Sequence, residues 1–276
     1  MRIPLDVVGD IAILKFSRYI PWIYKKYYGW KLLRQNKSIK VVLEKTAGFS
    51  GVLRIQETKW IAGEKRKDTV HRENDCSFYL DVDETYFSPR LSQDRKIMCE
   101  QVLKIIKPKS KVLVMFAGVS PLPIVLAKTL KRNKIFAEII SSELNKKACE
   151  YGEKNVRMNK VENYVKVFCG DSRKLCESLS KKKERFDFIF MLRPNLEETF
   201  LDAALKVAHR GVSPAGQKER TIIFYHGFSE SEEKISEEIL RDIAKTKRKV
   251  SKLEIRKAGD IGVRKNRYSV KFSLLD

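Results

Sequence analysis

The stretch VLVMFAGVSPLPIVLAKTLKRNKIFAEIISSEL, residues 112–144, contains the pattern that decides the fold. Its apolar run at 112–116 ends at a turn with Gly118, which is typical of a buried strand. Pro121 then opens an amphipathic helix near 121–132, and a second apolar run follows at 135–140. A strand, a helix and another buried strand predict a βαβ unit, which requires a parallel sheet.

The same alternation continues toward the C-terminus. The predicted strands lie at 165–169, 186–191 and 221–226, and the helices between them near 145–158, 173–180 and 196–208. Ser229, with Glu232 three residues on, predicts a capped helix. Two last strands, at 252–257 and 268–275, predict a hairpin with one strand antiparallel. We therefore expect an α/β fold with a Rossmann-like sheet and a C-terminal hairpin, the layout of class I methyltransferases.

The N-terminal part differs in pattern and predicts a small α+β unit. An aromatic and basic stretch from Phe16 to Trp30 predicts a helix or two short ones, and its rings are expected in the core. Short β-branched segments at 38–45, 52–61 and 77–82 predict a small antiparallel sheet. Ser88 and Pro89 look like the N-cap and first position of a helix that runs to Ile106. We therefore divide the chain into domains at 1–85 and 86–276.

The composition points to a polyanionic partner. The chain has 276 residues and a formal net charge of +22 at pH 7, with the excess in both units. RNA, DNA and an anionic membrane are all open on charge alone. Adaptation to heat, with many surface ion pairs, explains only part of such an imbalance.

Several protein classes are disfavoured. No apolar stretch approaches the roughly 20 residues that span a bilayer, and the start MRIPLDVVGD lacks the apolar run of a secretory leader. The five cysteines form no CxxC pair, so we expect neither a disulfide framework nor a zinc site. A cytoplasmic protein without a bound metal fits this composition.

Three loops follow predicted parallel strands, at the edge where open α/β sheets bind ligands. They contain Phe116-Ala117-Gly118, Glu143-Leu144 and Gly170-Asp171-Ser172. Glu143 could accept hydrogen bonds from ribose hydroxyls, and Asp171 from the amine of adenine. Each acid alone is typical of a helix start, but their joint placement, with no phosphate cradle, favours S-adenosyl-L-methionine over a nucleotide.

Further segments carry a family resemblance. They are Tyr86-Phe87-Ser88-Pro89-Arg90-Leu91, Asn155-Val156-Arg157-Met158-Asn159, Phe200-Leu201-Asp202-Ala203 and Gly9-Asp10-Ile11-Ala12. Together with the three loops, they resemble the archaeal and eukaryotic tRNA (guanine-37 N1)-methyltransferases over nearly the whole chain. The resemblance implies a small tRNA-binding domain followed by a catalytic domain that uses S-adenosylmethionine.

The resemblance also implies catalytic roles. Guanine N1 carries a proton, so a base must remove it while a cation stabilises the charge that develops on O6. By position in the family, the base is Asp94 and the cation is Arg54. The residues alone would indicate a first-turn helix acid and a solvated strand cation. The family's acid is usually glutamate, so Asp94 has a shorter reach.

Other site residues are implied in the same way. Met191 and Pro194 are expected at the cofactor, and Tyr86, Arg90, Arg95 and Arg193 at the tRNA, although internal salt bridges would explain Arg90 and Arg95 nearly as well. Leu192 replaces an amide with which the family helps to place the target base. Its neighbours Arg193 and Pro194 resemble an archaeal subgroup that also methylates a wyosine precursor at C7.

We therefore expect a methyltransferase for guanosine 37 in the anticodon arm of tRNA, bifunctional with C7 methylation of 4-demethylwyosine, and monomeric. One alternative is the related aminocarboxypropyl transferase, which the intact Ser-Pro-Arg-Leu segment disfavours. Another is a non-catalytic tRNA-binding protein on the same scaffold, suggested by Val114, Ser120 and Leu192. We assign no catalytic role to His71, His209 or His226, although His226 ends a predicted strand at the ligand-binding edge.

Overall fold

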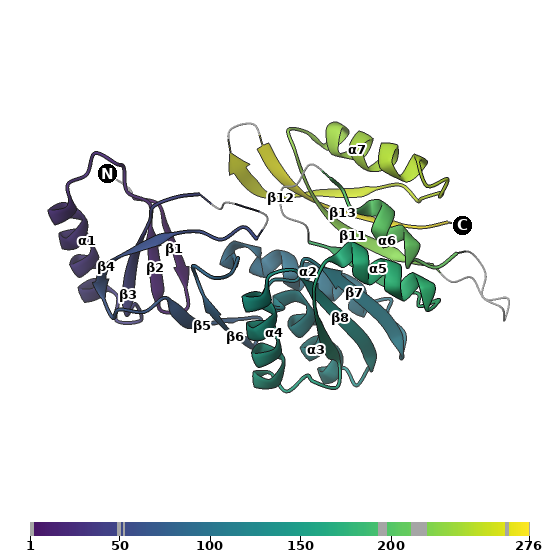
Figure 1. The fold of residues 1–276 in the computed structure, drawn as a ribbon, viewed down its shortest axis with the longest axis horizontal. Coiled ribbons are helices and arrows are strands. Elements are labelled where there is room, and N and C mark those ends of the chain that lie inside the picture. Colours follow the sequence, from purple (N-terminus) through teal and green to yellow (C-terminus); the bar gives the residue numbers. More distant parts are fainter. Residues whose placement is uncertain are drawn as a thin grey trace.

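A seven-stranded sheet forms the larger part of the molecule in the computed structural model, which describes residues 3–48, 51, 53–192, 198–210, 220–262 and 265–275 (Figure 1). The strand order is β12-β13-β11-β10-β7-β8-β9. The parallel strands are β7 (Ser110–Met115), β8 (Ala137–Glu143), β9 (Val165–Cys169), β10 (Phe188–Met191) and β11 (Ile222–Ser229). The hairpin of β12 (Glu254–Gly262) and β13 (Lys265–Ser273) joins antiparallel to β11. The predicted Rossmann-like sheet with its terminal hairpin is confirmed.

Helices cover both faces of this sheet. One face carries α2 (Ser92–Leu103), α3 (Pro121–Arg132) and α4 (Lys146–Met158), and the other α5 (Ser172–Lys181), α6 (Leu201–Lys206) and α7 (Glu232–Ala244). Along β7, Val112 and Val114 lie in the first core cluster, and Leu113 and Met115 in the second. Because both faces are buried, the strands are continuous apolar runs in the sequence.

The small N-terminal unit is a four-stranded sheet, β1-β2-β3-β4. Its elements are β1 (Leu5–Val8), β2 (Ile11–Leu14), α1 (Trp22–Gln35), β3 (Val41–Lys45) and β4 (Thr58–Gly63). Of the antiparallel sheet expected at 38–45, 52–61 and 77–82, the first two segments pair antiparallel as β3 and β4, but the third lies outside this sheet, in a separate hairpin. The sheet is completed by β1 and β2 instead, and it is not all antiparallel, since β2 and β3 are parallel. The reason is that α1 connects them, and a helical crossover returns the chain in the same direction.

Helix α1 exposes several of the rings that the sequence pattern assigned to the core. Tyr24, Tyr27 and Trp30 are 59–67% exposed, which makes that prediction wrong for them. The buried side of the helix is marked by Gly29, where a Cβ would lie 2.7 Å from the Ile61 side chain on β4. The helix therefore lies close to the sheet on one side (Figure 1). Its exposed aromatic rings lie on the solvent side.

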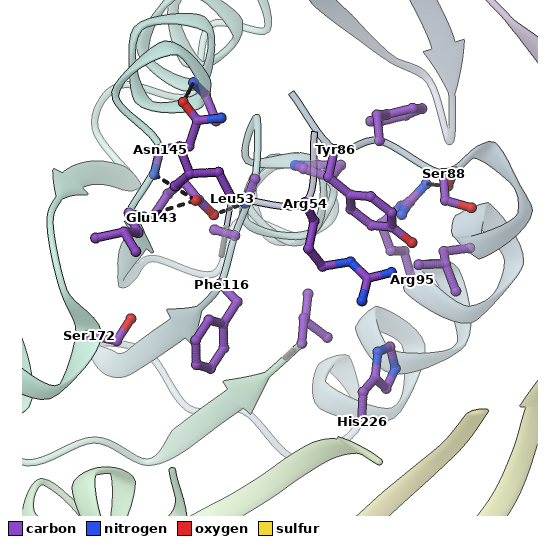
Figure 2. A pocket seen from close by; sticks show the side chains of 18 of the residues that line it. Leu53, Arg54, Tyr86, Ser88, Arg95, Phe116, Glu143, Asn145, Ser172 and His226 are labelled. Carbon is purple, nitrogen blue, oxygen red and sulfur yellow. Dashed lines mark hydrogen bonds between the residues drawn. The ribbon is translucent and has the colours of Figure 1, made fainter. Parts of the chain in front are cut away.

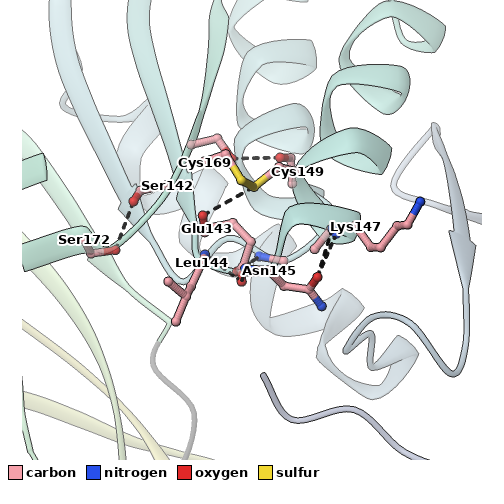
Figure 3. The surroundings of a disulfide bond; sticks show 12 residues. Ser142, Glu143, Leu144, Asn145, Lys147, Cys149, Cys169 and Ser172 are labelled. Atoms are coloured by element: carbon pink, nitrogen blue, oxygen red, sulfur yellow. Dashed lines mark hydrogen bonds between the residues drawn. A yellow bond between two sulfur atoms is a disulfide. The ribbon is translucent and has the colours of Figure 1, made fainter. Parts of the chain in front are cut away.

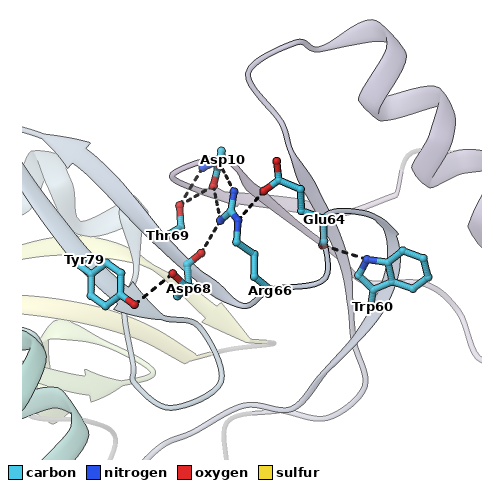
Figure 4. Close-up of polar contacts among 7 residues, drawn as sticks. All are labelled: Asp10, Trp60, Glu64, Arg66, Asp68, Thr69 and Tyr79. Carbon is cyan, nitrogen blue, oxygen red and sulfur yellow. Dashed lines mark hydrogen bonds and ion pairs between the residues drawn. The ribbon is translucent and has the colours of Figure 1, made fainter.

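A separate hairpin, β5 (Asp68–Glu73) and β6 (Cys76–Asp81), joins the two units. Toward α4, the Tyr79 N–H donates to Asn155 Oδ1 at 2.7 Å and the Ser77 N–H to Asn159 Oδ1 at 3.0 Å. Toward the small sheet, Arg66 donates to Asp10, and Thr69 Oγ1 donates to the same carboxylate at 2.7 Å (Figure 4).

Two helix starts differ from the sequence expectation. A short 3-10 turn (Pro89–Leu91) precedes α2, and the Ser88 side chain makes no capping bond. Helix α7 is capped by Ser231, whose side chain accepts from the Lys234 N–H at 3.3 Å, and not by Ser229, which ends β11. Within the described part of the chain, no helix combines the length and apolar character needed to cross a membrane.

Candidate active site

A pocket lies at the carboxyl ends of the parallel strands, where the segment before β4 and the segment before α2 also reach it (Figure 2). It brings together residues that are far apart in the sequence. Those expected from the sequence and found in its lining are Arg54, Tyr86, Arg95, Phe116, Ala117, Gly118, Glu143, Leu144, Asp171 and Ser172. Leu53, Asn145, Phe200, Phe228 and Arg267 also line it and were not expected.

Glu143 is fixed at the end of β8 by backbone amides. One carboxylate oxygen accepts from the Gly118 N–H at 2.8 Å, and the other accepts from the Leu144 and Asn145 N–H groups at 2.9 Å each (Figure 2). Gly118 has φ +57°, in the left-handed region that favours glycine. The turn after β7 and the acid after β8 therefore hold one another in place at the rim of the pocket.

Asp171 and Ser172 form the next part of the rim. Asp171 Oδ1 accepts from the Arg173 N–H at 2.6 Å and so caps α5. The Ser172 hydroxyl lies 3.0 Å from that of Ser142 on β8. The helix-cap interpretation of Asp171 is correct, and the same residue also lines the pocket.

An apolar wall lies between these acids. Phe116 packs edge-on against Phe200, with ring centres 5.1 Å apart, and Leu144 lies in the same lining. A slot with apolar walls and fixed carboxylates at its rim fits an adenine with a ribose, whose base is flat and apolar and whose hydroxyls are donors. The residues present therefore fit the nucleoside part of S-adenosylmethionine.

A disulfide ties the two acid-bearing loops together. Cys149, near the start of α4, is bonded to Cys169, the last residue of β9, with a Cα–Cα distance of 5.7 Å (Figure 3). The cysteine spacing predicted no disulfide framework, and this disulfide shows that prediction to be wrong. The pairing depends on α4 packing beside β9, which the spacing in the sequence does not reveal.

Cationic side chains form the other end of the pocket. Arg54 lies in a turn, at φ +50°, and not on the strand expected at 52–61. Its guanidinium lies 5.4 Å from the centre of the Tyr86 ring, and Arg267 donates to the Tyr86 hydroxyl at 3.5 Å. Arg267 reaches this place because β13 pairs with β11, opposite Phe228. Only that strand pairing could have identified it.

Asp94 is not among the residues that line the pocket. It is buried on α2, with Oδ2 2.8 Å from His226 Nε2 and Oδ1 paired with Arg256. Burial would raise the pKa of Asp94, but the hydrogen bond and charge of His226 and the nearby Arg256 hold it below its ordinary value. His226, to which the sequence assigned no catalytic role, lines the pocket instead.

Other expected contacts differ in position. The Arg95 guanidinium donates twice to Glu73, at 2.6 Å each, and once to the Ser88 carbonyl, so it forms the internal salt bridge that was the alternative to a tRNA contact, while it also lines the pocket. Arg90 is exposed and pairs with Asp6 outside this pocket. The Met191 side chain is buried in the core and is not among the residues that line the pocket, whereas Leu192 lines it. Arg193 and Pro194 lie outside the described residues.

Comparison with known proteins identifies relatives. A family model described as the TRM5/TYW2 methyltransferase domain matches residues 69–256. The tRNA (guanine(37)-N(1))/4-demethylwyosine(37)-methyltransferase Taw22 of Nanoarchaeum equitans is 31% identical, covering 98% of this chain and 99% of its own length. The tRNA (guanine(37)-N(1))-methyltransferase Trm5b of Pyrococcus abyssi is 34% identical over 81% of this chain, which spans only 59% of that relative.

The fold likeness extends over the whole chain. The structure of a complex of aTrm5 with tRNALeu matches with a TM-score of 0.80 and 26% identity, covering 99% of this chain and 72% of that one. The seven-stranded sheet, the terminal hairpin and the small N-terminal sheet therefore recur together in a solved structure.

Proposed function

The chain belongs to the TRM5/TYW2 methyltransferase family, and from this premise we propose that it transfers the methyl group of S-adenosyl-L-methionine to N1 of guanosine 37 in tRNA. One observation carries the proposal: a single pocket joins an apolar slot rimmed by Glu143 and Asp171 to an end lined by Arg54 and Arg267. The slot suits a nucleoside, and the cationic end suits a base whose oxygen gains negative charge.

The proposed cofactor contacts follow from this geometry. S-adenosylmethionine supplies an electrophilic methyl group on a sulfonium sulfur. Glu143, held by three amides, would accept hydrogen bonds from the ribose hydroxyls, and Asp171 would accept one from the adenine amine. Phe116 and Leu144 would cover the faces of the base, and the turn at Ala117 and Gly118 would lie against the ribose.

The proposed substrate contacts lie at the other end. Arg54 would stabilise the charge on guanine O6, and Tyr86, which contacts both Arg54 and Arg267, would pack against the base. We keep the division at residue 85 as part of the proposal: residues 1–85 supply Arg54 and contact tRNA, and residues 86–276 hold the cofactor. A cytoplasmic, monomeric enzyme remains our prediction.

A second activity is favoured by one specific observation. The Nanoarchaeum equitans relative, matched over essentially its full length, is described as acting on both guanosine 37 and 4-demethylwyosine 37. We propose that this chain also methylates the tricyclic precursor at C7, with Leu192 presenting an apolar surface to the wider ring system.

Nucleoside mass spectrometry tests both activities. The protein would be incubated with S-adenosylmethionine and one of three tRNAs: an unmodified tRNA bearing guanosine 37, the same tRNA with adenosine at that position, or a tRNA carrying 4-demethylwyosine. We expect 1-methylguanosine from the first and none from the second, and a gain of one methyl group in the third. Absence of 1-methylguanosine while tRNA and cofactor both bind would contradict the main proposal. An unmethylated third tRNA would remove the second activity.

A further inference from the structure

We propose that His226 is the catalytic group that accepts the proton of guanine N1, and that Asp94 is a positioning residue that acts through it. The inference rests on the proposed function, because it concerns the step in which N1 becomes nucleophilic. It differs from the role implied by the family resemblance, which assigns the base to Asp94. Three features support it. His226 lines the pocket, both carboxylate oxygens of Asp94 already have partners, and Nδ1 of His226 is left to accept a proton.

The sheet register brings His226 to the pocket. His226 on β11 pairs with Ser269 on β13, and Ser269 pairs with Arg256 on β12. Paired residues of neighbouring strands point to the same face, so the three side chains form one row. Along β11, Phe228 lines the pocket together with His226, while Tyr225 packs into the core on the opposite face.

Asp94 approaches this row from α2. The side chains of Asp94 and His226 are both 5% exposed, but of the two only His226 is among the residues that line the pocket. One carboxylate oxygen is occupied by His226 Nε2 at 2.8 Å and the other by Arg256. With both oxygens engaged and its pKa held below the ordinary value, Asp94 is a poor acceptor for a proton from guanine.

The contact with Asp94 selects the tautomer of His226. A carboxylate accepts hydrogen bonds, so Nε2 of the neutral ring carries the hydrogen and Nδ1 keeps its lone pair. Within the described ranges, His226 makes its side-chain hydrogen bond through Nε2, to Asp94. A neutral imidazole with a lone pair on Nδ1 has the acceptor that a general base needs.

The surrounding charges support a proton on this ring after transfer. The charged groups around His226 are Asp94 and Arg95 from α2, Arg256 from β12, Arg267 from β13 and Arg54 across the pocket. Arg95 is paired with Glu73, and Arg256 shares the Asp94 carboxylate with His226. Figure 2 shows Arg54 and His226 directed toward the same part of the pocket. A protonated His226 would form an ion pair with Asp94, which stabilises the product of the proton transfer.

The proposed step balances as follows. The N1 electron pair forms a bond to the methyl carbon, and the bond from that carbon to the sulfonium sulfur breaks with its electrons remaining on sulfur. The N1 proton moves to Nδ1 of His226 and passes to water after product release. Arg54 stabilises the negative charge that O6 carries between these events.

Single-turnover methyl transfer to tRNA, at saturating cofactor, tests the assignment. We expect His226→Ala to slow transfer by roughly a hundredfold or more, as for loss of a general base, and added imidazole to restore part of the rate. Asp94→Asn should slow transfer less, and the double variant should be no slower than His226→Ala, because Asp94 acts through the ring.

A matched control is available in the same chain. His209 also pairs with an aspartate, Asp187, at 3.4 Å, but neither lines this pocket. His209→Gln should therefore leave the transfer rate unchanged. If His226→Ala retains the wild-type rate while Asp94→Asn abolishes it, Asp94 is the base and the inference is wrong. A wild type that does not methylate guanosine 37 would instead contradict the proposed function.

A second readout does not depend on activity or on the folding of a variant. Nitrogen-15 NMR of the wild-type protein, without cofactor or tRNA, reports which ring nitrogen of His226 is protonated. We expect hydrogen on Nε2 and none on Nδ1 at pH 8. Hydrogen on Nδ1 would overturn the inference, because that nitrogen could then accept no proton from the substrate.

Discussion

Substitution of Glu143 should test most directly whether the slot binds the cofactor. The two oxygens of Glu143 accept from three backbone amides and face the pocket, so Glu143→Gln replaces one acceptor by a donor and removes the charge. A hydrogen bond to a charged group contributes about 1.5–3 kcal/mol. We therefore expect S-adenosylmethionine to bind about 10- to 100-fold more weakly, measured by isothermal titration calorimetry.

The matched control for Glu143 lies on the same strand. Glu138 is an exposed acid of β8 outside the pocket. Glu138→Gln should leave the cofactor affinity unchanged. Equal affinity of Glu143→Gln and the wild type would remove Glu143 from the cofactor site.

Glu73 should make the stability of the fold sensitive to acid. Its side chain is 4% exposed and accepts two hydrogen bonds from Arg95. Burial raises the pKa of Glu73, but hydrogen bonds from His71 and Arg95 outweigh it and hold the pKa below the ordinary value of 4.5. The carboxylate therefore stabilises the fold above pH 4.5, and this contribution is lost as the pH falls through the lowered pKa.

Glu73→Gln tests this linkage. At pH 7 it should lower the free energy of unfolding by about 3 kcal/mol, because Arg95 remains buried without its carboxylate. The difference from the wild type should shrink as the pH falls below 4.5. Urea denaturation at several pH values measures both effects, and exposed Glu57→Gln serves as control. A difference that does not depend on pH would contradict the linkage.

At the scale of elements, the Cys149–Cys169 disulfide links α4 to the end of β9 across 20 residues of sequence. Closing a loop of this size lowers the entropy of the unfolded chain by an amount worth about 3 kcal/mol. We expect reductant to lower the melting temperature of the wild type and to leave that of a Cys149→Ser, Cys169→Ser double variant unchanged. Identical melting temperatures with and without reductant would contradict a stabilising disulfide.

The outer face of α1 should contribute to tRNA binding. Ile23, Tyr27 and Trp30 lie four and three residues apart on one exposed stripe, with Lys26 and Lys31 close by in the helix. Stacking of a base on an aromatic ring contributes about 1–3 kcal/mol. We expect Tyr27→Ala with Trp30→Ala to weaken tRNA binding by about tenfold or more, without changing cofactor affinity.

The control for α1 is Leu240 on α7, another exposed apolar residue of a helix. Leu240→Ala should leave tRNA affinity unchanged in a filter-binding assay. If the α1 variant also binds tRNA normally, the exposed stripe has no part in tRNA recognition.

The sequence predicted elements better than contacts. The β-branched and aromatic segment 165–169 coincides with β9, and the segment 121–132, which begins with Pro121, coincides with α3, because local pattern and tertiary structure agree there. Arg54, in contrast, was expected on a strand but lies in a turn at positive φ. The Asp94–His226 pair joins residues 132 apart in the chain. Such pairs depend on how α2 docks on the sheet, which no local pattern encodes.

At the scale of the whole molecule, the pocket needs both units. Arg54 comes from the N-terminal unit, while Glu143 and Asp171 come from the sheet edge of the larger one. The hairpin β5–β6 connects the two units, because Tyr79 bonds to Asn155 on α4 and Thr69 donates to Asp10 beside the small sheet. We therefore expect that a tRNA contacts both units, and that these contacts orient the base that enters the pocket.

The net charge of +22 sets how that substrate is attracted. Lysines and arginines that neutralise phosphates release counterions, so tRNA affinity should fall steeply with salt. For six or more such contacts, we expect a loss of about a thousandfold or more between 50 and 200 mM salt. S-adenosylmethionine carries no phosphate, so its affinity should change little over the same range and serves as the internal control. Fluorescence titrations of both ligands at stepwise salt measure the slopes. A tRNA slope as shallow as that of the cofactor would show that recognition depends on the pocket alone, and not on the basic surface of the molecule.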